Sequence, residues 1–313
     1  MGQDTAVAGG LTTIYPSFAA NLDTGLVRLS GDGLGNSFYT YFHAVVMAHQ
    51  SGARMIYPTW RALRIGPLLR GERSTRTYWR TFKPFRDELH GVRKLSALLN
   101  IGGRRVVVEI GKSGRGAIQP GVLNLVRSRE FTFEGLHPFR TMIRERLLSV
   151  INDRIPADHT WGRGGFVAVH VRLGDFASTL DSKSLLSGKA NVRIPLDWYV
   201  KVVRELRAAN PSRVVYIFSD GEDEELAPLL NLGAKPYRSG SDIQDLLALS
   251  SASTLVGSNS TYSRWAAFLG DMPSIWVKKL VREEKPSAAQ TPLLHVSVDG
   301  ADAGAARDFC SQS

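Results

Sequence analysis

The stretch Val167-Ala168-Val169-His170-Val171-Arg172-Leu173-Gly174-Asp175-Phe176 decides the fold, because an apolar run ends there abruptly in polar and flexible residues. The β-branched and apolar residues from Phe166 to Val171 are typical of a buried strand. His170, Arg172 and Asp175 then lie at the strand end and in the loop after it. In an open α/β sheet, ligands bind outside the carboxyl ends of the strands. Because a guanidinium suits phosphate and the glycine of this loop allows close backbone approach, the stretch predicts an anion site.

Composition and charge favour a globular chain with an anionic partner. With 313 residues, the chain is long enough for two domains. Lys and Arg number 39 against 29 Asp and Glu, and the net charge of +10 favours nucleic acid, an anionic membrane surface or phosphorylated substrates. The basic residues form no compact run, and the sequence carries no helix-turn-helix, zinc-finger or RNP pattern. Nucleic acid is therefore a minor alternative.

The sequence also favours a cytoplasmic location. Cys310 is the only cysteine, which excludes an internal disulfide and suits a reducing compartment. The start lacks a basic segment followed by an apolar core, and no run of 18 apolar residues occurs. We therefore expect no signal peptide and no membrane span, with peripheral contact at the inner membrane face as an alternative.

A glycine-rich segment in the first half predicts a second ligand loop. Residues 26–30 are predicted as a short strand and residues 37–51 as a helix. Between them lies a loop that contains Asp32, Gly33, Gly35 and Asn36. Such an arrangement can cradle phosphate, but the spacing G-x-G-x-G lacks the third glycine of the dinucleotide fingerprint. A tight turn with close helix packing explains the glycines equally well.

The rest of the first half is predicted as α/β, with a polar linker at its end. Residues 1–25 are predicted as a loose lead-in, and residues 60–99 as a basic, substrate-facing region. The linker at residues 152–160 is the predicted domain boundary. A P-loop ending at Gly111-Lys-Ser is excluded, because the required earlier glycine is Val106. The remaining predicted elements are strands at 53–57 and 106–110 and a helix at 142–151.

The second half alternates strands and helices, which predicts a parallel, doubly wound sheet. The acidic run Glu222-Asp-Glu-Glu225 is predicted to begin a helix, where it complements the dipole, in preference to binding metal. Trp265 and Phe268 are predicted as core. The predicted elements are a strand at 166–171, a helix at 196–209, a strand at 213–218, a helix at 241–249, a strand at 254–257, a helix beginning at 258–261 and a last strand at 274–277.

Three of these strands end in polar groups, which meet at one edge of a parallel sheet. The first is the His170 loop, the second carries Asp220, and the third is Ser258-Asn259-Ser260-Thr261. The third lies at a helix N-terminus, where free N–H groups and the dipole favour a diphosphate. Arg172 can hold the same phosphates, which leaves His170 and Asp220 for a base or ribose. The constellation predicts a nucleotide-diphosphate site.

Four blocks of the sequence resemble the motifs of the α-1,2-fucosyltransferases of the H-antigen and bacterial type. They occur in the family's order, and the first is similar in its Gly-Leu-Gly-Asn core. Three departures stand out: many members have arginine where this chain has Leu173, glutamine where it has Ser37, and tryptophan where it has Arg264. The blocks are residues 26–36, 169–176, 218–220 and 258–269.

The resemblance implies a GT-B fold, in which two Rossmann-like domains face a cleft. It also implies GDP-fucose as donor, inversion at the anomeric carbon and no metal or other cofactor. By motif position, Arg172 matches the arginine assigned to the diphosphate, and His170 and Asp220 match guanosine-facing positions. The absence of a second arginine at Leu173 puts donor affinity and the identity of the GDP-sugar in question.

We therefore predict a glycosyltransferase that moves L-fucose to a sugar hydroxyl of a glycan or lipid-linked oligosaccharide. The predicted division is an acceptor domain over residues 1–155, a donor domain over 156–285 and a tail over 286–313. Asp175 and Asp32 are the candidate general bases, and a structural role in the loop is the favoured alternative for Asp175. The alternatives for the whole chain are transfer from another GDP-sugar, a non-catalytic nucleotide- or polyanion-binding protein, and RNA binding.

Overall fold

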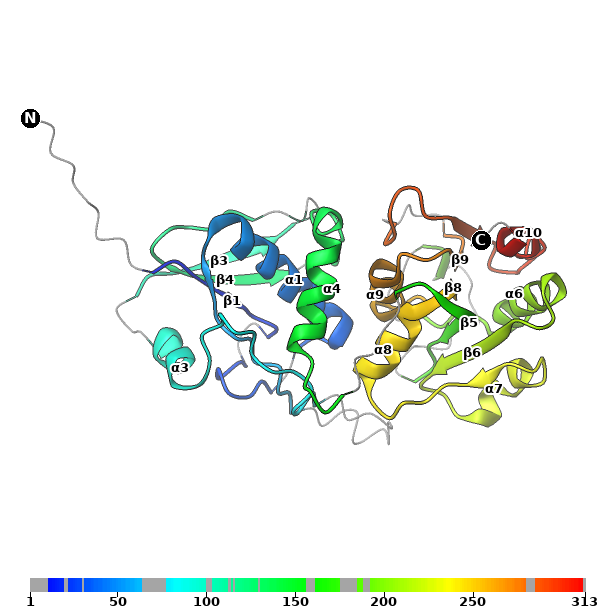
Figure 1. The fold of residues 1–313 in the computed structure, drawn as a ribbon, viewed down its shortest axis with the longest axis horizontal. Coiled ribbons are helices and arrows are strands. Elements are labelled where there is room, and N and C mark those ends of the chain that lie inside the picture. The colour runs from blue at the N-terminus through cyan, green and yellow to red at the C-terminus, as the bar shows by residue number, and fades with distance from the viewer. Residues whose placement is uncertain are drawn as a thin grey trace, which may run out of the picture. The chain divides into compact units, whose positions relative to one another are not determined.

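The described part of this computed structural model forms two compact units, one before residue 156 and one after residue 160. Each unit holds one parallel sheet with helices (Figure 1). This arrangement confirms the predicted α/β class with two parallel sheets. The structure describes residues 11–19, 22–29, 31–63, 77–99, 103–111, 114, 116–128, 130–155, 161–174, 185–187, 192–279 and 285–311.

The first unit has a four-stranded parallel sheet in the order β2-β1-β4-β3. Its helices are α1 (Leu34–Ser51), α3 (Gly91–Leu99), the short 3-10 helix η1 (His137–Phe139) and α4 (Arg140–Val150). Helix α1 packs against β1 and β4. The strands are β1 (Thr13–Pro16), β2 (Arg54–Met55), β3 (Arg105–Ile110) and β4 (Leu123–Ser128).

Helix α1 forms where the sequence predicts it and begins three residues earlier. Phe38 and Phe42 are fully buried, and Gly52 ends the helix in the left-handed conformation at φ 69°. At the other end, the Leu34 N–H donates to the hydroxyl of Tyr78 at 2.9 Å. The first turn therefore includes Gly35 and Asn36, which the sequence placed in the loop before the helix.

Two strand predictions in this unit are wrong or incomplete. The first strand is β1, within the segment predicted as a loose lead-in, whereas Arg28 in the predicted 26–30 strand makes only isolated bridges to Asp23 and Ala62. Arg28 is fully buried, and its Nη1 donates to the Asp32 carbonyl at 3.1 Å. Strand β4 was not predicted, because Asn124 interrupts its apolar pattern. The buried Asn124 amide donates to carbonyl groups of neighbouring segments instead.

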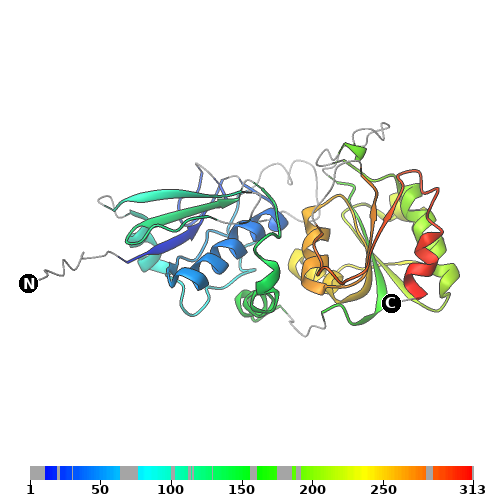
Figure 2. The same ribbon diagram turned by 90° about the horizontal axis from the view of Figure 1, so that it is seen from above.

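The second unit has a six-stranded parallel sheet in the order β10-β9-β8-β5-β6-β7. The chain winds outwards from β5 to β7 and then returns to β8 on the other side, so this is the doubly wound order predicted. Figure 2 shows helices on both faces of the sheet. The strands are β5 (Gly164–Val171), β6 (Val214–Ser219), β7 (Lys235–Pro236), β8 (Ala252–Val256), β9 (Ser274–Val277) and β10 (Leu293–Val296).

Two groups of helices cover the two faces of this sheet (Figures 1 and 2). Helices α8 and α9 pack against each other, and α6 packs against both α7 and α10. Trp265 and Phe268 of α9 are fully buried, as predicted. The helices are α6 (Leu196–Ala209), α7 (Asp223–Leu230), α8 (Asp242–Ser251), α9 (Thr261–Gly270) and α10 (Ala305–Ser311).

The C-terminal segment belongs to this second unit, which differs from the predicted tail at 286–313. Strand β10 pairs in parallel with β9, so β9 is not the last strand. Helix α10 packs on α6, with Ala303 and Ala306 buried in the core. The signal was weak because β10 has only four residues and α10 only seven.

None of the helices in the described ranges is long and apolar enough to span a membrane.

Candidate functional site

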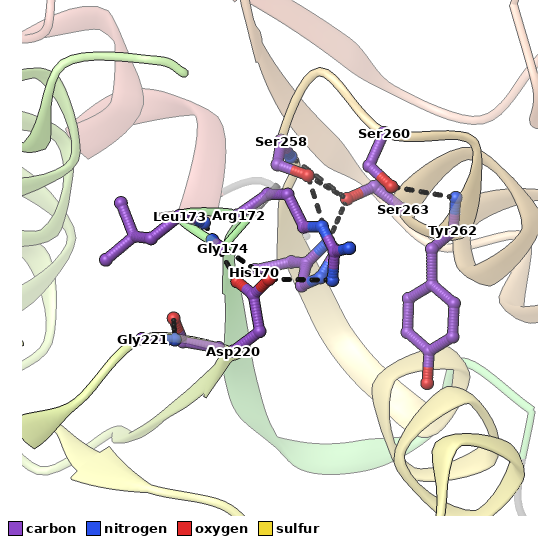
Figure 3. Close-up of polar contacts among 11 residues, drawn as sticks. His170, Arg172, Leu173, Gly174, Asp220, Gly221, Ser258, Ser260, Tyr262 and Ser263 are labelled. Carbon is purple, nitrogen blue, oxygen red and sulfur yellow. Dashed lines mark hydrogen bonds and ion pairs between the residues drawn. The ribbon is translucent and has the colours of Figure 1, made fainter. Parts of the chain in front are cut away.

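The predicted site lies at the point where the strand order of the second sheet reverses. Strands β5 and β8 are neighbours in the sheet, and their carboxyl ends lead into residues 172–174 and 257–260. Strand β6, on the other side of β5, ends at Ser219. A crevice at such a switch point is where doubly wound sheets bind ligands. Figure 3 shows His170, Arg172, Asp220 and Ser258 together at this edge.

Arg172 is fixed by an ion pair with Asp220. Its Nη1 lies 2.9 Å from Asp220 Oδ2, and both side chains are largely buried, with 20% and 24% of their surface exposed. The same carboxylate accepts hydrogen bonds from the backbone N–H groups of Leu173 at 2.8 Å and Gly174 at 3.0 Å. Asp220 therefore holds both the guanidinium and the loop that carries it (Figure 3). This is the loop-anchoring role that the sequence suggested for Asp175, which lies outside the described residues.

Two glycines allow the loops after β5 and β6 to approach closely. A Cβ atom at Gly174 would lie 2.4 Å from Asp220 Oδ2. A Cβ atom at Gly221 would lie 2.5 Å from Cδ1 of Leu173. Leu173 itself is 7% exposed and belongs to the apolar core of the unit. The position where many family members have a second arginine is therefore a packing position in this chain.

His170 is buried and neutral. Burial, together with the positive charge of Arg172, lowers the pKa of His170 to about 3, against the opposing effect of Asp220. Its Nδ1 lies 3.0 Å from the Ser258 hydroxyl and 2.5 Å from the Ser263 hydroxyl. The ring also lies 5.3 Å from the ring of Tyr262. An imidazole held in this way can take part in hydrogen bonds without adding charge.

The N-terminus of α9 completes the site. Ser260 caps the helix by accepting a hydrogen bond from the Tyr262 N–H at 3.2 Å, and Thr261 is the first helical residue. Asn259 accepts a hydrogen bond from Lys279 at 2.5 Å. The first N–H groups of a helix and its dipole favour an anion. The structure thus brings together His170, Arg172, Asp220 and residues 258–261, all predicted from the sequence.

Other predicted residues lie in the first unit. Asp32, Gly33, Gly35 and Asn36 all belong to the glycine loop and the start of α1. The Asp32 carbonyl accepts hydrogen bonds from Arg28 at 3.1 Å and from the Ser37 hydroxyl at 3.3 Å. The sequence predicts a strand at 26–30 immediately before this loop, and residues 26–29, as far as the structure describes this segment, belong to no strand.

Ser263 and Lys279 were missed by sequence reasoning. Ser263 is fully buried and contacts His170 and Ser258, and Lys279 binds Asn259. Ser263 lies within the fourth motif, so that motif was the signal available for it. No local pattern indicates Lys279, because it follows β9 and lies 20 residues after Asn259, to which it donates.

The acidic residues after β6 cap helix α7 and form an ion pair. Glu222 caps α7, and its N–H donates to Glu225 Oε2 at 3.1 Å in a capping box. Asp223 forms an ion pair with Arg238. Among the residues that the structure describes, no three His, Cys, Asp or Glu side chains gather in a way that could hold a metal ion.

Comparison with known proteins gives the class of this site. The sequence pattern of glycosyl transferase family 11 matches residues 142–290, which contain all of β5, β8 and α9. The chain is thus a glycosyltransferase, as its motifs predicted. The matched region, just under half of the chain, is that of glycosyl transferase family 11, and the four blocks resemble the α-1,2-fucosyltransferases. No curated protein matches the chain.

Three solved structures align with the chain at low identity. The NodZ α-1,6-fucosyltransferase soaked with GDP-fucose is 15% identical, with 85% of this chain and 95% of that chain covered and a TM-score of 0.49. The fucosyltransferase NodZ from Bradyrhizobium is 12% identical, with 84% and 94% covered and a TM-score of 0.47. The E. coli heptosyltransferase WaaC with ADP-2-deoxy-2-fluoro heptose is 17% identical, with a TM-score of 0.36. That alignment covers 54% of this chain and 47% of WaaC.

Proposed function

We propose that this glycosyltransferase transfers L-fucose from GDP-fucose to a sugar hydroxyl, with inversion and in α-1,2 linkage. One observation carries the proposal: Arg172 lies fixed at the switch point of a doubly wound sheet, inside the region that matches the family. As the bond to GDP breaks, negative charge develops on the diphosphate. A positioned cation and a helix N-terminus stabilise that charge without reorganisation.

The second unit holds the donor in this proposal. Arg172 and the N-terminus of α9 at residues 258–261 bind the diphosphate, and His170 lies beside them. The motif resemblance places both His170 and Asp220 at guanosine-facing positions. We assign His170 to the diphosphate instead, because its ring contacts Ser258, the first of the residues that bind the diphosphate in this proposal. The contacts of Asp220 also support a different role, because both of its oxygens already accept hydrogen bonds from the loop after β5. We therefore assign Asp220 to positioning Arg172.

The first unit holds the acceptor in this proposal, with Gly33, Gly35 and Asn36 as its ligand loop. The acceptor is a glycan or a lipid-linked oligosaccharide. Displacement at the anomeric carbon needs a group that takes the proton of the acceptor hydroxyl, and Asp175 and Asp32 are the candidates. An Asp→Asn change keeps an oxygen for hydrogen bonds but removes the base.

The base is tested by comparing Asp175→Asn with Asp32→Asn. The variant that removes the base loses most of its kcat while GDP still binds by calorimetry. A variant that removes only a loop anchor loses GDP affinity or stability instead. If both variants keep kcat and GDP affinity, neither aspartate is the base.

Two rival functions use the same site. In one, the chain transfers a different GDP-sugar. Leu173 supports this rival, because it is a buried leucine where many family members have a second arginine to bind the donor. In the other, the site binds a nucleotide without catalysis. RNA binding through the net charge of +10 is a weaker rival, and steep loss of RNA affinity with salt would favour it.

The deciding experiment uses the purified protein and a panel of GDP-sugars. Calorimetry ranks their affinities, and release of free GDP is measured with and without a glycan acceptor. We expect GDP-fucose to bind best and GDP release to require the acceptor. If only a GDP-sugar other than GDP-fucose releases GDP, the fucose assignment is contradicted. If GDP-sugars bind but no acceptor leads to GDP release, the non-catalytic rival is supported.

The location that we propose is the cytoplasm, with peripheral contact to an anionic membrane. The net charge of +10 supports this contact, and a lipid-linked acceptor would lie at such a surface. Co-sedimentation with phosphatidylserine vesicles, lost at high salt, is the expected result. Equal binding to neutral vesicles would contradict the electrostatic basis of the contact.

A further inference from the structure

A buried pair of hydroxyl groups contacts one nitrogen of His170. Ser258 is 3% exposed and Ser263 is fully buried. Their Oγ atoms lie 3.0 Å apart, and both lie within hydrogen-bonding distance of His170 Nδ1 (Figure 3). The backbone N–H of Ser258 also donates to Ser263 Oγ at 3.0 Å. The three side chains therefore form a closed hydrogen-bond network.

The hydrogen count of this network depends on which ring nitrogen carries the proton. If Nδ1 is bare, the Ser263 hydroxyl donates to it and the Ser258 hydroxyl donates to Ser263 Oγ, so every hydroxyl hydrogen has an acceptor. If Nδ1 carries the proton, one hydroxyl donates to the other and the second hydroxyl hydrogen is left without an acceptor. A buried donor without a partner costs about 1–3 kcal/mol.

The other ring nitrogen, Nε2, faces a different environment. Among the described residues none accepts a hydrogen bond from it. Arg172 lies two residues further along the chain and places a positive charge near the ring. A doubly protonated ring would be repelled by this charge and would also leave a hydroxyl hydrogen unpaired. The charge of Arg172 favours a neutral ring against the opposing effect of Asp220, and the hydroxyl count places its proton on Nε2.

We propose that Ser258 and Ser263 fix His170 as the neutral Nε2–H tautomer, so that the ring presents an N–H donor to the phosphate oxygens of a bound nucleoside diphosphate. This proposal rests on the donor site proposed above and deepens it. Arg172 then supplies the charge, and His170 supplies a directed hydrogen bond that does not change with pH in the neutral range. Ser258 and Ser263 act through His170, which makes them positioning residues with respect to this donor.

The tautomer is tested directly by NMR of protein labelled with ¹⁵N in histidine. We expect the His170 ring to show a protonated Nε2 and a bare Nδ1 from pH 5 to pH 8. The His170→Gln spectrum assigns the resonance among the seven histidines of the chain. A proton on Nδ1, or a ring that ionises in this range, would overturn the proposal. This readout does not depend on whether the chain transfers fucose.

Variants separate the two roles of the ring. Glutamine places an amide N–H near the position of Nε2, whereas asparagine places its amide near the position of Nδ1. We expect His170→Gln to keep GDP affinity within a few-fold of the unmodified protein. We expect His170→Asn to lose about 10- to 100-fold, the value of one hydrogen bond to a charged group. Equal losses in both variants would contradict a donor at Nε2.

The hydroxyl pair is tested by the double variant Ser258→Ala/Ser263→Ala. Either hydroxyl alone can still donate to Nδ1, so each single variant should keep the Nε2–H tautomer in the NMR spectrum. The double variant should give a mixture of tautomers and weaker GDP binding, and thermal unfolding checks that it is folded. A pure Nε2–H ring in the folded double variant would show that other groups fix the tautomer. If the double variant does not fold, the spectrum of the unmodified protein still decides the tautomer.

Discussion

Asp220 Oδ2 binds the guanidinium of Arg172 at 2.9 Å and the N–H of Gly174 at 3.0 Å, so one carboxylate oxygen joins the cation to the loop that carries it. The two residues come from neighbouring strand ends, β5 and β6. Because the cation is held before a ligand arrives, little side-chain entropy is lost when it binds a phosphate. The position of the Arg172 guanidinium therefore depends on Asp220 as well as on strand β5, which Arg172 follows.

Arg172→Ala should fold and lose activity. One phosphate-directed cation in a water-poor site contributes several kcal/mol to the transition state, so we expect kcat/KM to fall about 100-fold or more. Steady-state kinetics and GDP calorimetry measure the loss. Arg204→Ala, at an exposed position of α6, is the matched control and should leave kcat/KM unchanged. Near-normal turnover of a folded Arg172→Ala protein would remove Arg172 from the mechanism.

Asp220→Asn should raise the KM for the GDP-sugar by about 10-fold or more. The amide keeps one acceptor oxygen, but it loses the ion pair with Arg172 and directs an N–H toward the backbone donors of the loop. Affinities for GDP and ADP are compared by calorimetry in the variant and the unmodified protein. If Asp220 positions Arg172, both affinities fall by the same factor. A selective loss of GDP would show that Asp220 contacts guanosine.

Gly174→Ala should weaken donor binding while the protein stays folded. The added Cβ would lie 2.4 Å from Asp220 Oδ2, so the loop must move away from the carboxylate that anchors it. We expect GDP affinity to fall by about 10-fold, the effect of one charge-assisted hydrogen bond. Gly165→Ala in β5 is the control, because a Cβ there meets nothing within 4 Å. Equal affinities of the two variants would contradict the close-approach argument.

The elements of the second unit could be predicted because their signals are local. Helix α6 was predicted to its observed bounds from Tyr199, Val202, Val203 and Leu206, which recur at helical spacing and are all buried. Strand β7 and strand β10 were missed. The two residues of β7 are exposed and include a proline, and β10 has only four residues. Such short edge strands form because they pair with a neighbouring strand. The local sequence does not indicate this pairing.

The sequence indicates which side chains lie at the carboxyl edge of the second sheet, but not which of them contact each other. The motifs indicated His170, Arg172 and Asp220, because each follows a strand and strand ends meet in a parallel sheet. Ser263 lies 93 residues from His170, and Asp220 lies 46 residues from Gly174. Which hydroxyl or carboxylate meets the loop after β5 depends on how β8 and β6 align with β5. The motifs match Asp220 to a guanosine-facing position, whereas its hydrogen bonds support the positioning role that we propose.

Metal removal should leave the activity unchanged. In this mechanism the charge on the diphosphate is balanced by Arg172 and the N-terminus of α9, and the carboxylates of α7 are engaged in a helix cap and an ion pair. Initial rates are compared before and after EDTA treatment and after addition of Mg²⁺ or Mn²⁺. A rate that falls with EDTA and returns with Mn²⁺ would contradict the prediction and make Asp220, Glu222 and Asp223 candidate ligands.

Acid should destabilise the second unit through His170. Its pKa is about 3 in the folded chain, against an ordinary value of 6.5, so between these values the unfolded chain binds a proton that the folded chain does not. Stability is therefore fully present above pH 6.5 and falls as the pH drops toward 3, by about 1.4 kcal/mol for each pH unit in the middle of that range. Urea unfolding gives the free energy of unfolding at pH 7 and pH 5 for the unmodified protein and for His170→Gln. The contribution of His170 is the difference between the stability losses of the two proteins over this interval. Because glutamine does not titrate, the variant should lose about 2 kcal/mol less than the unmodified protein over this interval. Equal losses would mean that His170 already carries a proton in the folded chain, which would also contradict the neutral ring inferred from its hydroxyl partners.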